Sequence, residues 1–328
     1  MSKADQSNTP ATENLLEELC LRGRQRNAVF LFVHERAIAI GLRICTAFSI
    51  LTTALIIGML SYESLRFLRE VSIVEFLTTF KWSPMLGNTS SFGIWPLVCG
   101  TLLVTLVAAV FALPIGLFSA IYLSEYAAPR TRSILKPILE ILAGIPSVVY
   151  GFFAIIVITP TLQYLAKAIT GEPLFGAYSA ASAGLAVAIM ILPIVTSLSD
   201  DSLRAVPKSL RDGAYALGAT RFDVSLRVVV PAALSGVIAS FLLAITRAIG
   251  ETMIVALAAG GLARMAILPW EEVQTMTGYM VQIFTGDAPA TGVEYKSSFA
   301  VAMVLFLITF SLTLTGYKAL SKFREEYE

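Results

Sequence analysis

Four stretches of this sequence lack any charged side chain and exceed the roughly 20 residues that a helix needs to cross a lipid bilayer. They are Ile94–Leu123, Ile141–Ala166, Ala177–Ser199 and Ser297–Tyr317. Two further apolar stretches are interrupted by charge: Ala37–Leu60 contains Arg43, and Ala232–Ala259 contains Arg247 and Glu251. Apolar residues follow one another instead of alternating, which favours membrane-spanning helices over barrel strands. We therefore predict an all-α, polytopic membrane protein with about six transmembrane helices.

The distribution of charge predicts how these helices are oriented. Of the 328 residues 56% are hydrophobic and 14% charged, whereas soluble domains contain roughly a quarter charged residues. If the N-terminus is cytoplasmic, 16 of the 24 lysines and arginines fall in inside segments, 6 in outside loops and 2 within helices. We expect cytoplasmic N- and C-termini, a tail of residues 1–36 with a short amphipathic helix at Glu13–Cys20, and a transmembrane domain of residues 37–328. The near-zero net charge gives no indication of nucleic-acid binding.

Signatures of an enzyme are missing from the sequence. There is no H-E-x-x-H zinc motif, no G-x-S-x-G elbow and no G-x-x-x-x-G-K-[ST] phosphate loop. We interpret the only histidine, His34, as a surface residue, and Cys20, Cys45 and Cys99 as apolar fillers without metal-ligand spacing. No metal or cofactor is expected in this chain. If it moves a solute, the energy must come from an ion gradient or from another subunit.

The segment Asp200–Leu234 is the largest expected on the cytoplasmic side. A first helix stops at Gly218, and Thr220 with Asp223 three residues later predicts the capped start of a second. An ordinary connecting loop or a helix-turn-helix for DNA are the alternatives to a docking element. Small residues at positions 213, 214 and 216 favour docking, because they let a partner approach the helix backbone closely.

This segment resembles the EAA loop of ABC-importer permeases, whose pattern is E-A-A-x3-G-x9-I-x-L-P. Here the corresponding residues are Asp212, Gly213 and Ala214, then Gly218, Val228, Val230 and Pro231, at the same spacing. The resemblance implies that residues of about 200–231 form a coupling loop that docks on the ATPase subunit, and that Asp212, Gly213, Ala214, Gly218 and Pro231 belong to it. Gly213 in place of alanine weakens the helix by about 0.5–1 kcal/mol.

Five further stretches resemble phosphate-specific importer permeases, in particular the PstC type. They are Gly93–Leu106, Ala120–Arg132, Glu140–Ala154, Met190–Arg221 and Arg247–Met253. The resemblance implies a type I ABC-importer permease in the bacterial cytoplasmic (inner) membrane. It also implies a sister permease of PstA type, ATPase subunits of PstB type that bind ATP-Mg, and an extracytoplasmic phosphate-binding protein of PstS type. The alternatives are a permease for phosphonate, sulfate or molybdate, or an ion-coupled secondary transporter, which needs no EAA-like loop.

Arg247 and Glu251 lie four residues apart near the expected bilayer midplane, and residues at this spacing stack on one face of a helix. Each charge costs about 2.5–3.5 kcal/mol to insert there, so neither can face lipid. One interpretation is a structural ion pair. The other is that Arg247 binds a phosphate oxygen through its planar fork and Glu251 accepts a hydrogen bond from protonated phosphate, which sulfate cannot donate. The resemblance places Arg247 and Glu251 on the transport path, with Gly250 and Thr252 beside them.

Two other regions carry expectations. Gly144, Pro146 and Gly151 predict a kink inside a membrane helix, beside the path or as plain packing. The outer segments Ser61–Phe92 and Gly260–Lys296 either meet a solute-delivering protein or simply cap the helices.

Overall fold

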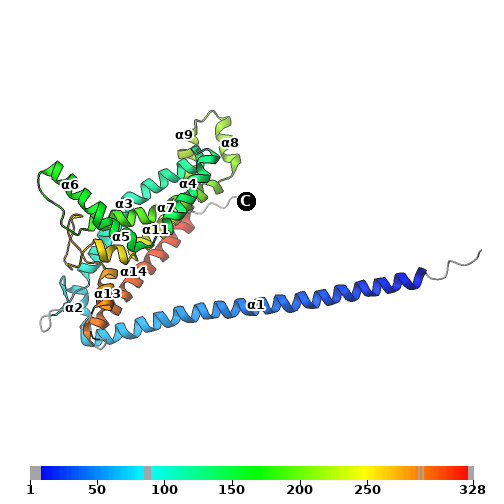
Figure 1. The fold of residues 1–328 in the computed structure, drawn as a ribbon, viewed down its shortest axis with the longest axis horizontal. Coiled ribbons are helices and arrows are strands. Elements are labelled where there is room, and N and C mark those ends of the chain that lie inside the picture. The colour runs from blue at the N-terminus through cyan, green and yellow to red at the C-terminus, as the bar shows by residue number, and fades with distance from the viewer. Residues whose placement is uncertain (1–8, 85–89, 287–288, 290–291, 324–328) are drawn as a thin grey trace, which may run out of the picture. The chain divides into compact units, whose positions relative to one another are not determined.

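The computed structural model of the chain describes residues 9–84, 90–286, 289 and 292–323 (Figure 1). Contacts divide the chain into two compact units, residues 1–59 and 60–328. The helices and strands, in chain order, are α1 (Thr9–Glu70), α2 (Ile73–Thr78), β1 (Trp82–Ser83), β2 (Ser91–Phe92), α3 (Trp95–Ile121), α4 (Pro129–Ala143), α5 (Ser147–Phe153), α6 (Thr159–Thr170), α7 (Ala180–Ala205), α8 (Lys208–Ala216), α9 (Arg221–Val224), α10 (Val230–Ala232), α11 (Leu234–Ile249), α12 (Met253–Ala258), α13 (Met276–Thr285) and α14 (Val293–Phe323). Among the described residues, three π-helical segments, η2 (Tyr122–Tyr126), η3 (Ala154–Ile158) and η4 (Ser225–Val229), join neighbouring helices.

The number of helices that are long and apolar enough to span a membrane agrees with the prediction of about six. Five stretches are long and apolar enough: Ile38–Glu70, Trp95–Tyr126, Ser147–Thr170, Ala180–Ala205 and Val293–Lys318. A sixth is possible if the pair Arg221–Ala232 and Leu234–Ile249, bent by 70°, counts as one span. These counts refer to the described part of the chain.

The first unit consists of the N-terminal part of α1. Every side chain that is described there is exposed, including Ile38, Phe48 and Leu55. An apolar helix surface of this kind requires cover by lipid or by another protein. The expected short amphipathic helix Glu13–Cys20 falls inside α1, but its side chains lie outside the described residues, so its amphipathic role stays a prediction.

The centre of the second unit is the packing of α3 against α7 (Figure 1). Two glycines permit their close approach. A Cβ atom on Gly184 would lie 2.6 Å from Val107, and one on Gly116 would lie 2.6 Å from Val195. Small residues allow backbones to approach in membranes, where apolar packing cannot be driven by water. α7 also contacts α11 through the 2.8 Å hydrogen bond between Ser199 and Ser240.

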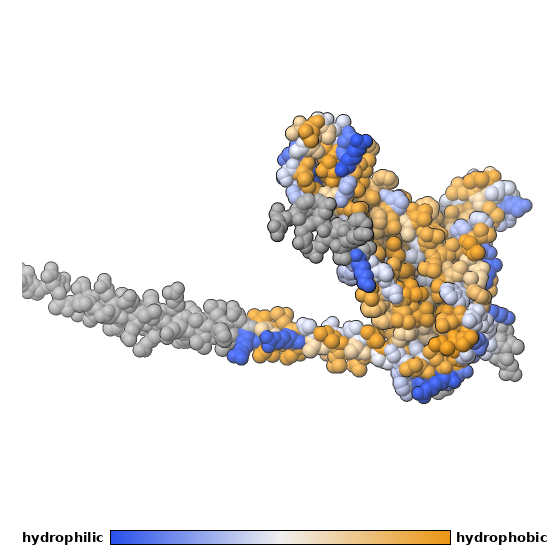
Figure 2. Space-filling model, turned by 180° about the vertical axis from the view of Figure 1, so that it is seen from behind, coloured by the Kyte–Doolittle hydropathy of each residue, from blue (hydrophilic) through white to orange (hydrophobic). Residues whose placement is uncertain are grey.

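A second apolar cluster lies at the end of the unit where α2, β1, β2 and α13 meet. Trp82 of β1 pairs with Phe92 of β2 and packs edge-on against Tyr279 of α13, with ring centroids 5.0 Å apart. The Tyr279 hydroxyl lies 2.6 Å from Ser297 Oγ, and burial raises the pKa of Tyr279. Figure 2 shows apolar residues over most of the visible face of this unit and polar residues at its extremities.

Candidate functional site

The candidate path residues lie at a break between α11 and α12. α11 ends at Ile249, Gly250 follows as its C-cap, and α12 begins at Met253. The prediction of one continuous helix through Ala232–Ala259 is therefore wrong, as is the stacking of Arg247 and Glu251 on one helical face. Gly250 favours the break because glycine is about 1 kcal/mol less favourable than alanine within a helix. Glu251, the next residue, favours it because its carboxylate accepts hydrogen bonds from backbone N–H groups.

Glu251 uses its side chain to cap α12. Its Oε1 accepts hydrogen bonds from the backbone N–H groups of Met253 at 3.2 Å and Ile254 at 3.3 Å. The residue is 8% exposed. Its backbone carbonyl accepts a 2.6 Å bond from Thr277 of α13. The carboxylate of Glu251 is therefore bonded to the backbone at the break and not to Arg247.

Arg247 stands in the last turn of α11 with its side chain exposed. Its guanidinium forms no hydrogen bond or ion pair with any residue that the structure describes. A guanidinium cannot give up its charge at physiological pH, so within a membrane this group requires water, an anion or a partner chain. The prediction of a structural Arg247–Glu251 ion pair finds no support among the described contacts.

The other two predicted path residues flank Glu251. Thr252 donates its hydroxyl to the Gly250 carbonyl at 3.1 Å. A Cβ atom on Gly250 would meet only the backbone oxygens of Thr246 and Arg247, at 3.7 Å and 3.9 Å. Gly250 is thus open on the side away from its own helix, and its predicted role of admitting a solute or a neighbouring helix stays a prediction.

The chain does break near Gly144 and Pro146, but the break lies between two helices and not inside a membrane-spanning one. α4 ends at Ala143 and α5 begins at Ser147, so these residues separate two helices and the candidate span starts after them. The prediction of a kink inside a single helix through Ile141–Ala166 is wrong there. Gly151 lies within α5 and packs closely on α12. A Cβ atom at this position would lie only 2.7 Å from Leu257.

The EAA-like residues form an exposed helical turn. α8 contains Asp212, Gly213 and Ala214 and has no fully buried residue. A Cβ atom on Gly213 would meet nothing within 4 Å, whereas Ala214 packs against the apolar cluster formed by α3, α7, α9 and α11. Leu217 and Phe222 beside them are 89% and 63% exposed. The segment therefore offers an apolar surface to a partner.

The local signals in this segment are confirmed. Gly218 has a φ of +85°, which suits glycine, and the Thr220 side chain accepts a hydrogen bond from the Asp223 backbone N–H. The second helix continues through η4 and Pro231 to Ala232.

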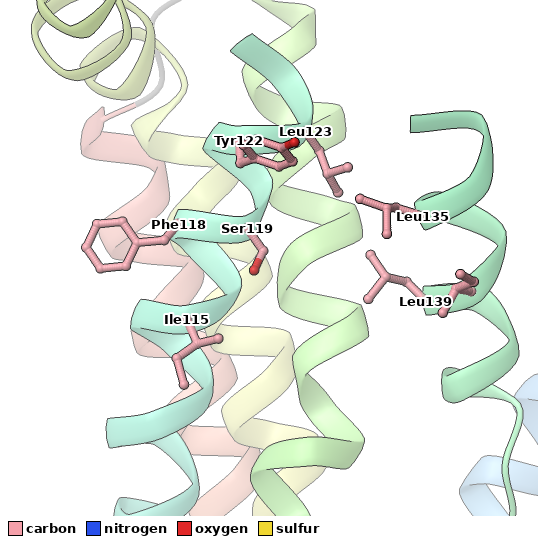
Figure 3. A pocket seen from close by; sticks show the side chains of 8 residues that line it. Ile115, Phe118, Ser119, Tyr122, Leu123, Leu135 and Leu139 are labelled. Atoms are coloured by element: carbon pink, nitrogen blue, oxygen red, sulfur yellow. The ribbon is translucent and has the colours of Figure 1, made fainter. Parts of the chain in front are cut away.

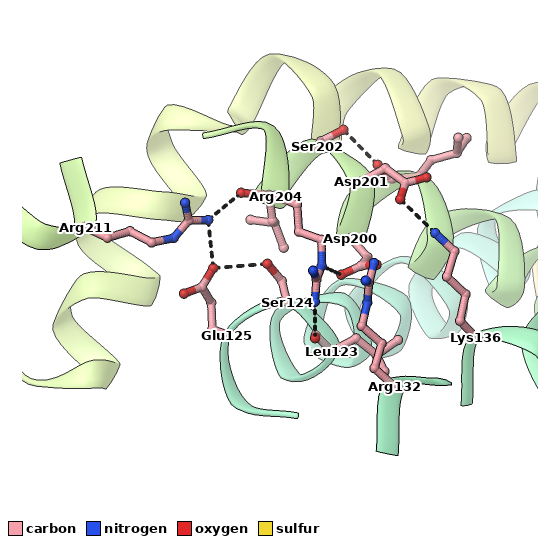
Figure 4. A network of polar contacts seen from close by, with 12 residues as sticks. Leu123, Ser124, Glu125, Arg132, Lys136, Asp200, Asp201, Ser202, Arg204 and Arg211 are labelled. Carbon is pink, nitrogen blue, oxygen red and sulfur yellow. Dashed lines mark hydrogen bonds and ion pairs between the residues drawn. The ribbon is translucent and has the colours of Figure 1, made fainter. Parts of the chain in front are cut away.

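A charged network that the sequence analysis missed lies at the same end of the unit (Figure 4). Arg211 of α8 donates to Glu125 of η2 at 3.0 Å. Asp200 of α7 accepts from Arg132 of α4 at 2.6 Å and from Arg204 at 3.2 Å. Only the Asp200–Arg204 spacing of four residues was visible in the sequence. The other pairs join residues far apart in the chain.

An apolar cavity of about 480 Å³ lies between α3 with η2 and α4 (Figure 3). Its lining contains Ile115, Phe118, Leu135 and Leu139 and no charged side chain. This lining does not suit an oxyanion, so the cavity does not compete with the break as a candidate path. Among the described residues, no group of three or more histidine, cysteine, aspartate or glutamate side chains could hold a metal ion.

Comparison with known proteins places the chain among transport proteins. A family model described as "binding-protein-dependent transport system inner membrane component" matches residues 112–324. The chain is 34% identical over 244 residues to the probable ABC transporter permease protein YqgH of Bacillus subtilis, an alignment covering 74% of this chain and 76% of that protein. It is 34% identical over 250 residues to the phosphate transport system permease protein PstC of Mesorhizobium japonicum, covering 72% and 75%.

A solved structure of a bacterial ABC transporter involved in the import of the polysaccharide alginate has the same fold. The match has a TM-score of 0.58 at 11% identity and covers 82% of this chain and 90% of that chain. The protein is thus a multi-pass membrane protein with the fold of type I ABC-importer permeases. It belongs to the family of binding-protein-dependent transport system inner membrane components.

Proposed function

We propose that this chain is the transmembrane permease subunit of an ATP-driven inorganic phosphate importer in the bacterial cytoplasmic membrane. The observation that carries the proposal is the similarity to a PstC permease over most of both chains. The exposed, family-type docking segment supports an ATP-driven mechanism over an ion-coupled one.

The path for phosphate runs past the break between α11 and α12. Arg247 supports this assignment because its planar donor fork is exposed and pairs with none of the described side chains. Such a fork matches two oxygens of an oxyanion. Gly250 leaves one side of the break open, and Thr252 adds a hydroxyl beside it.

Glu251 contributes the selection between protonated and deprotonated oxyanions. The hydrogen bonds to α12 use Oε1 alone, which leaves Oε2 to accept a hydrogen bond from a protonated phosphate oxygen. Fully deprotonated sulfate has no hydrogen to donate and is repelled by the carboxylate.

Energy enters from partner chains. An ATPase of PstB type binds ATP-Mg and docks on the coupling segment with Asp212, Gly213, Ala214, Gly218 and Pro231. A sister permease of PstA type completes the path, and a phosphate-binding protein of PstS type delivers the solute from outside. Both termini and the coupling segment are cytoplasmic, and this chain itself hydrolyses no ATP.

Phosphate uptake tests the proposal most directly. In a strain lacking other phosphate importers, expression of this chain with its partner subunits should restore uptake, and ATP depletion should abolish it. Excess phosphonate, sulfate or molybdate should compete weakly. If one of those anions were taken up faster than phosphate, that anion and not phosphate would be the solute. Uptake that follows the ion gradient, from a chain that captures no ATPase, would reject the ATP-driven mechanism.

A further inference from the structure

We infer that Glu125 and Arg211 form a buried link that makes the coupling helix α8 move together with the cytoplasmic ends of α3 and α7. The two side chains are positioning residues: they contact neither solute nor nucleotide and act through the helices that they join. The inference rests on the proposed function, because it concerns how force on α8 reaches the break at Arg247.

α8 has few other attachments to the rest of the unit. α8 has no fully buried residue, so apolar packing alone holds it weakly to the unit. It is joined to α7 only through Val206 and Pro207, and the chain leaves it through Gly218, at a φ of +85°. A helix held in this way would tilt on its own when a partner pushed it.

Arg211 supplies the missing attachment. Besides Glu125, it donates to the carbonyl oxygens of Val206 at 2.6 Å and Leu203 at 2.7 Å. Both carbonyls belong to the end of α7, where backbone oxygens have no partner within the helix. One guanidinium thus joins α8 to the end of α7 and to η2, which continues α3.

Burial makes this attachment stiff. The Glu125 side chain is 8% exposed and that of Arg211 15% exposed. Ser124 holds the carboxylate with a 3.0 Å hydrogen bond, and Arg204 ties α7 to the Leu123 carbonyl. Charged hydrogen bonds at such a site are stronger and less screened than at the surface.

The helices that receive the force lead to the break. α3 and α7 pack closely at Gly184 and Gly116, where an added Cβ atom would lie 2.6 Å from the facing helix. α7 bonds to α11 through Ser199 and Ser240, and α11 ends at Arg247 and Gly250. These contacts form a continuous route by which movement of α8 reaches the candidate path.

The test uses the complete transporter in proteoliposomes and compares phosphate uptake per ATP hydrolysed. Glu125→Gln keeps size but removes the charge, and Arg211→Lys keeps charge but cannot reach three acceptors. Each should assemble and hydrolyse ATP, yet lose about fivefold or more in uptake per ATP. The double variant should be no worse than Arg211→Lys alone, because both changes break one link. Lys136→Gln is the matched control: Lys136 lies on α4, outside the coupling segment, and its pair with Asp201 is at the surface, with the aspartate 56% exposed, so coupling should be unchanged.

A second readout does not depend on the solute. A cysteine at position 252, in a background without the three natural cysteines, should change its reactivity when ATP and vanadate trap the complex. This change should be lost in Glu125→Gln and kept in Lys136→Gln. Failure of the wild-type complex to take up phosphate would reject the proposed solute and leave this measurement valid.

Several results would overturn the link. Normal uptake per ATP and normal trapping-dependent reactivity in assembled Glu125→Gln and Arg211→Lys would do so, and so would an equal loss in the control. If neither variant assembles, Glu125→Asp decides, because it keeps the charge but lengthens the 3.0 Å contact. If Glu125→Asp takes up as much phosphate per ATP as the unchanged complex, or if all three variants fail to assemble, Glu125 and Arg211 have only a structural role and the proposed link is rejected.

Discussion

At the residue scale, Arg247 and Glu251 have separate tasks. Glu251 holds the backbone of α12 through Oε1, whereas the Arg247 guanidinium forms no hydrogen bond or ion pair with the described residues. The sequence indicated that both charges needed a wet or protein-lined environment. It could not show that a helix ends between them, because the same apolar composition suits a continuous and a broken helix.

Substitutions at Arg247 separate oxyanion binding from ion pairing. Arg247→Lys keeps the charge but loses the two-pronged donor geometry, so uptake per assembled complex should fall roughly tenfold or more, as expected for a lost charge-assisted hydrogen bond. The double variant Arg247→Met with Glu251→Gln should remain inactive, since the two side chains do not neutralise each other. Substantial recovery of uptake in that double variant would contradict the path role and restore the ion-pair interpretation.

Substitutions at Glu251 distinguish the cap from the carboxylate charge. Glu251→Gln retains an oxygen for the N–H groups of Met253 and Ile254, so the complex should assemble normally while phosphate uptake falls. Glu251→Ala removes the cap as well and should lower thermal stability by about 1 kcal/mol. The measurements are the unfolding temperature of the purified complex and uptake per complex. Equal stability of the two variants would contradict the capping role.

At the element scale, the apolar runs predicted helices well because every backbone polar group in a bilayer must bond within its own segment. The caps at Thr220 and Gly218 were equally readable, since each depends on neighbours a few residues away. The Arg211–Glu125 contact joins residues 86 positions apart, and nothing in the local pattern encodes it. The close glycine contacts between α3 and α7 are long-range in the same sense.

Gly213 offers a sharper test of docking than Ala214. The structure places open space around Gly213, whereas Ala214 packs against the apolar cluster beneath α8. Gly213→Trp should therefore leave the chain folded but abolish binding of the ATPase, and Gly213→Ala should preserve binding. Capture of the ATPase by the purified chain measures both. Undiminished capture by Gly213→Trp would exclude this face of α8 as the dock.

The α3–α7 contact predicts a stability change without a docking change. Gly184→Val introduces carbon atoms where a Cβ alone would lie 2.6 Å from Val107, and overpacking of this kind costs about 1–3 kcal/mol. The unfolding temperature in detergent should fall. Gly261→Ala is the control, because a Cβ atom there meets nothing within 4 Å of the described structure. Equal unfolding temperatures would show that the helices can separate at no cost.

At the scale of the whole molecule, the fold agrees with the charge asymmetry of the sequence. The α3–α4 junction and the α7–α9 region fall at one end of the second unit (Figure 1). Both regions are rich in arginine and lysine. The opposite end contains the two-stranded β1–β2 pair, α2 and α13. The positive-inside tendency supports the proposal that the arginine-rich end is cytoplasmic.

Cysteine labelling in intact cells tests this orientation. In a background without Cys20, Cys45 and Cys99, a cysteine at Ser209 of α8 and one at Leu262, which is 49% exposed, both present accessible thiols. A membrane-impermeant reagent applied from outside should label position 262 and not position 209. After the membrane is permeabilised, both should react, which controls for local accessibility. Labelling of position 209 in intact cells would invert the topology, and with it the placement of the ATPase dock, because nucleotide is available only on the cytoplasmic side.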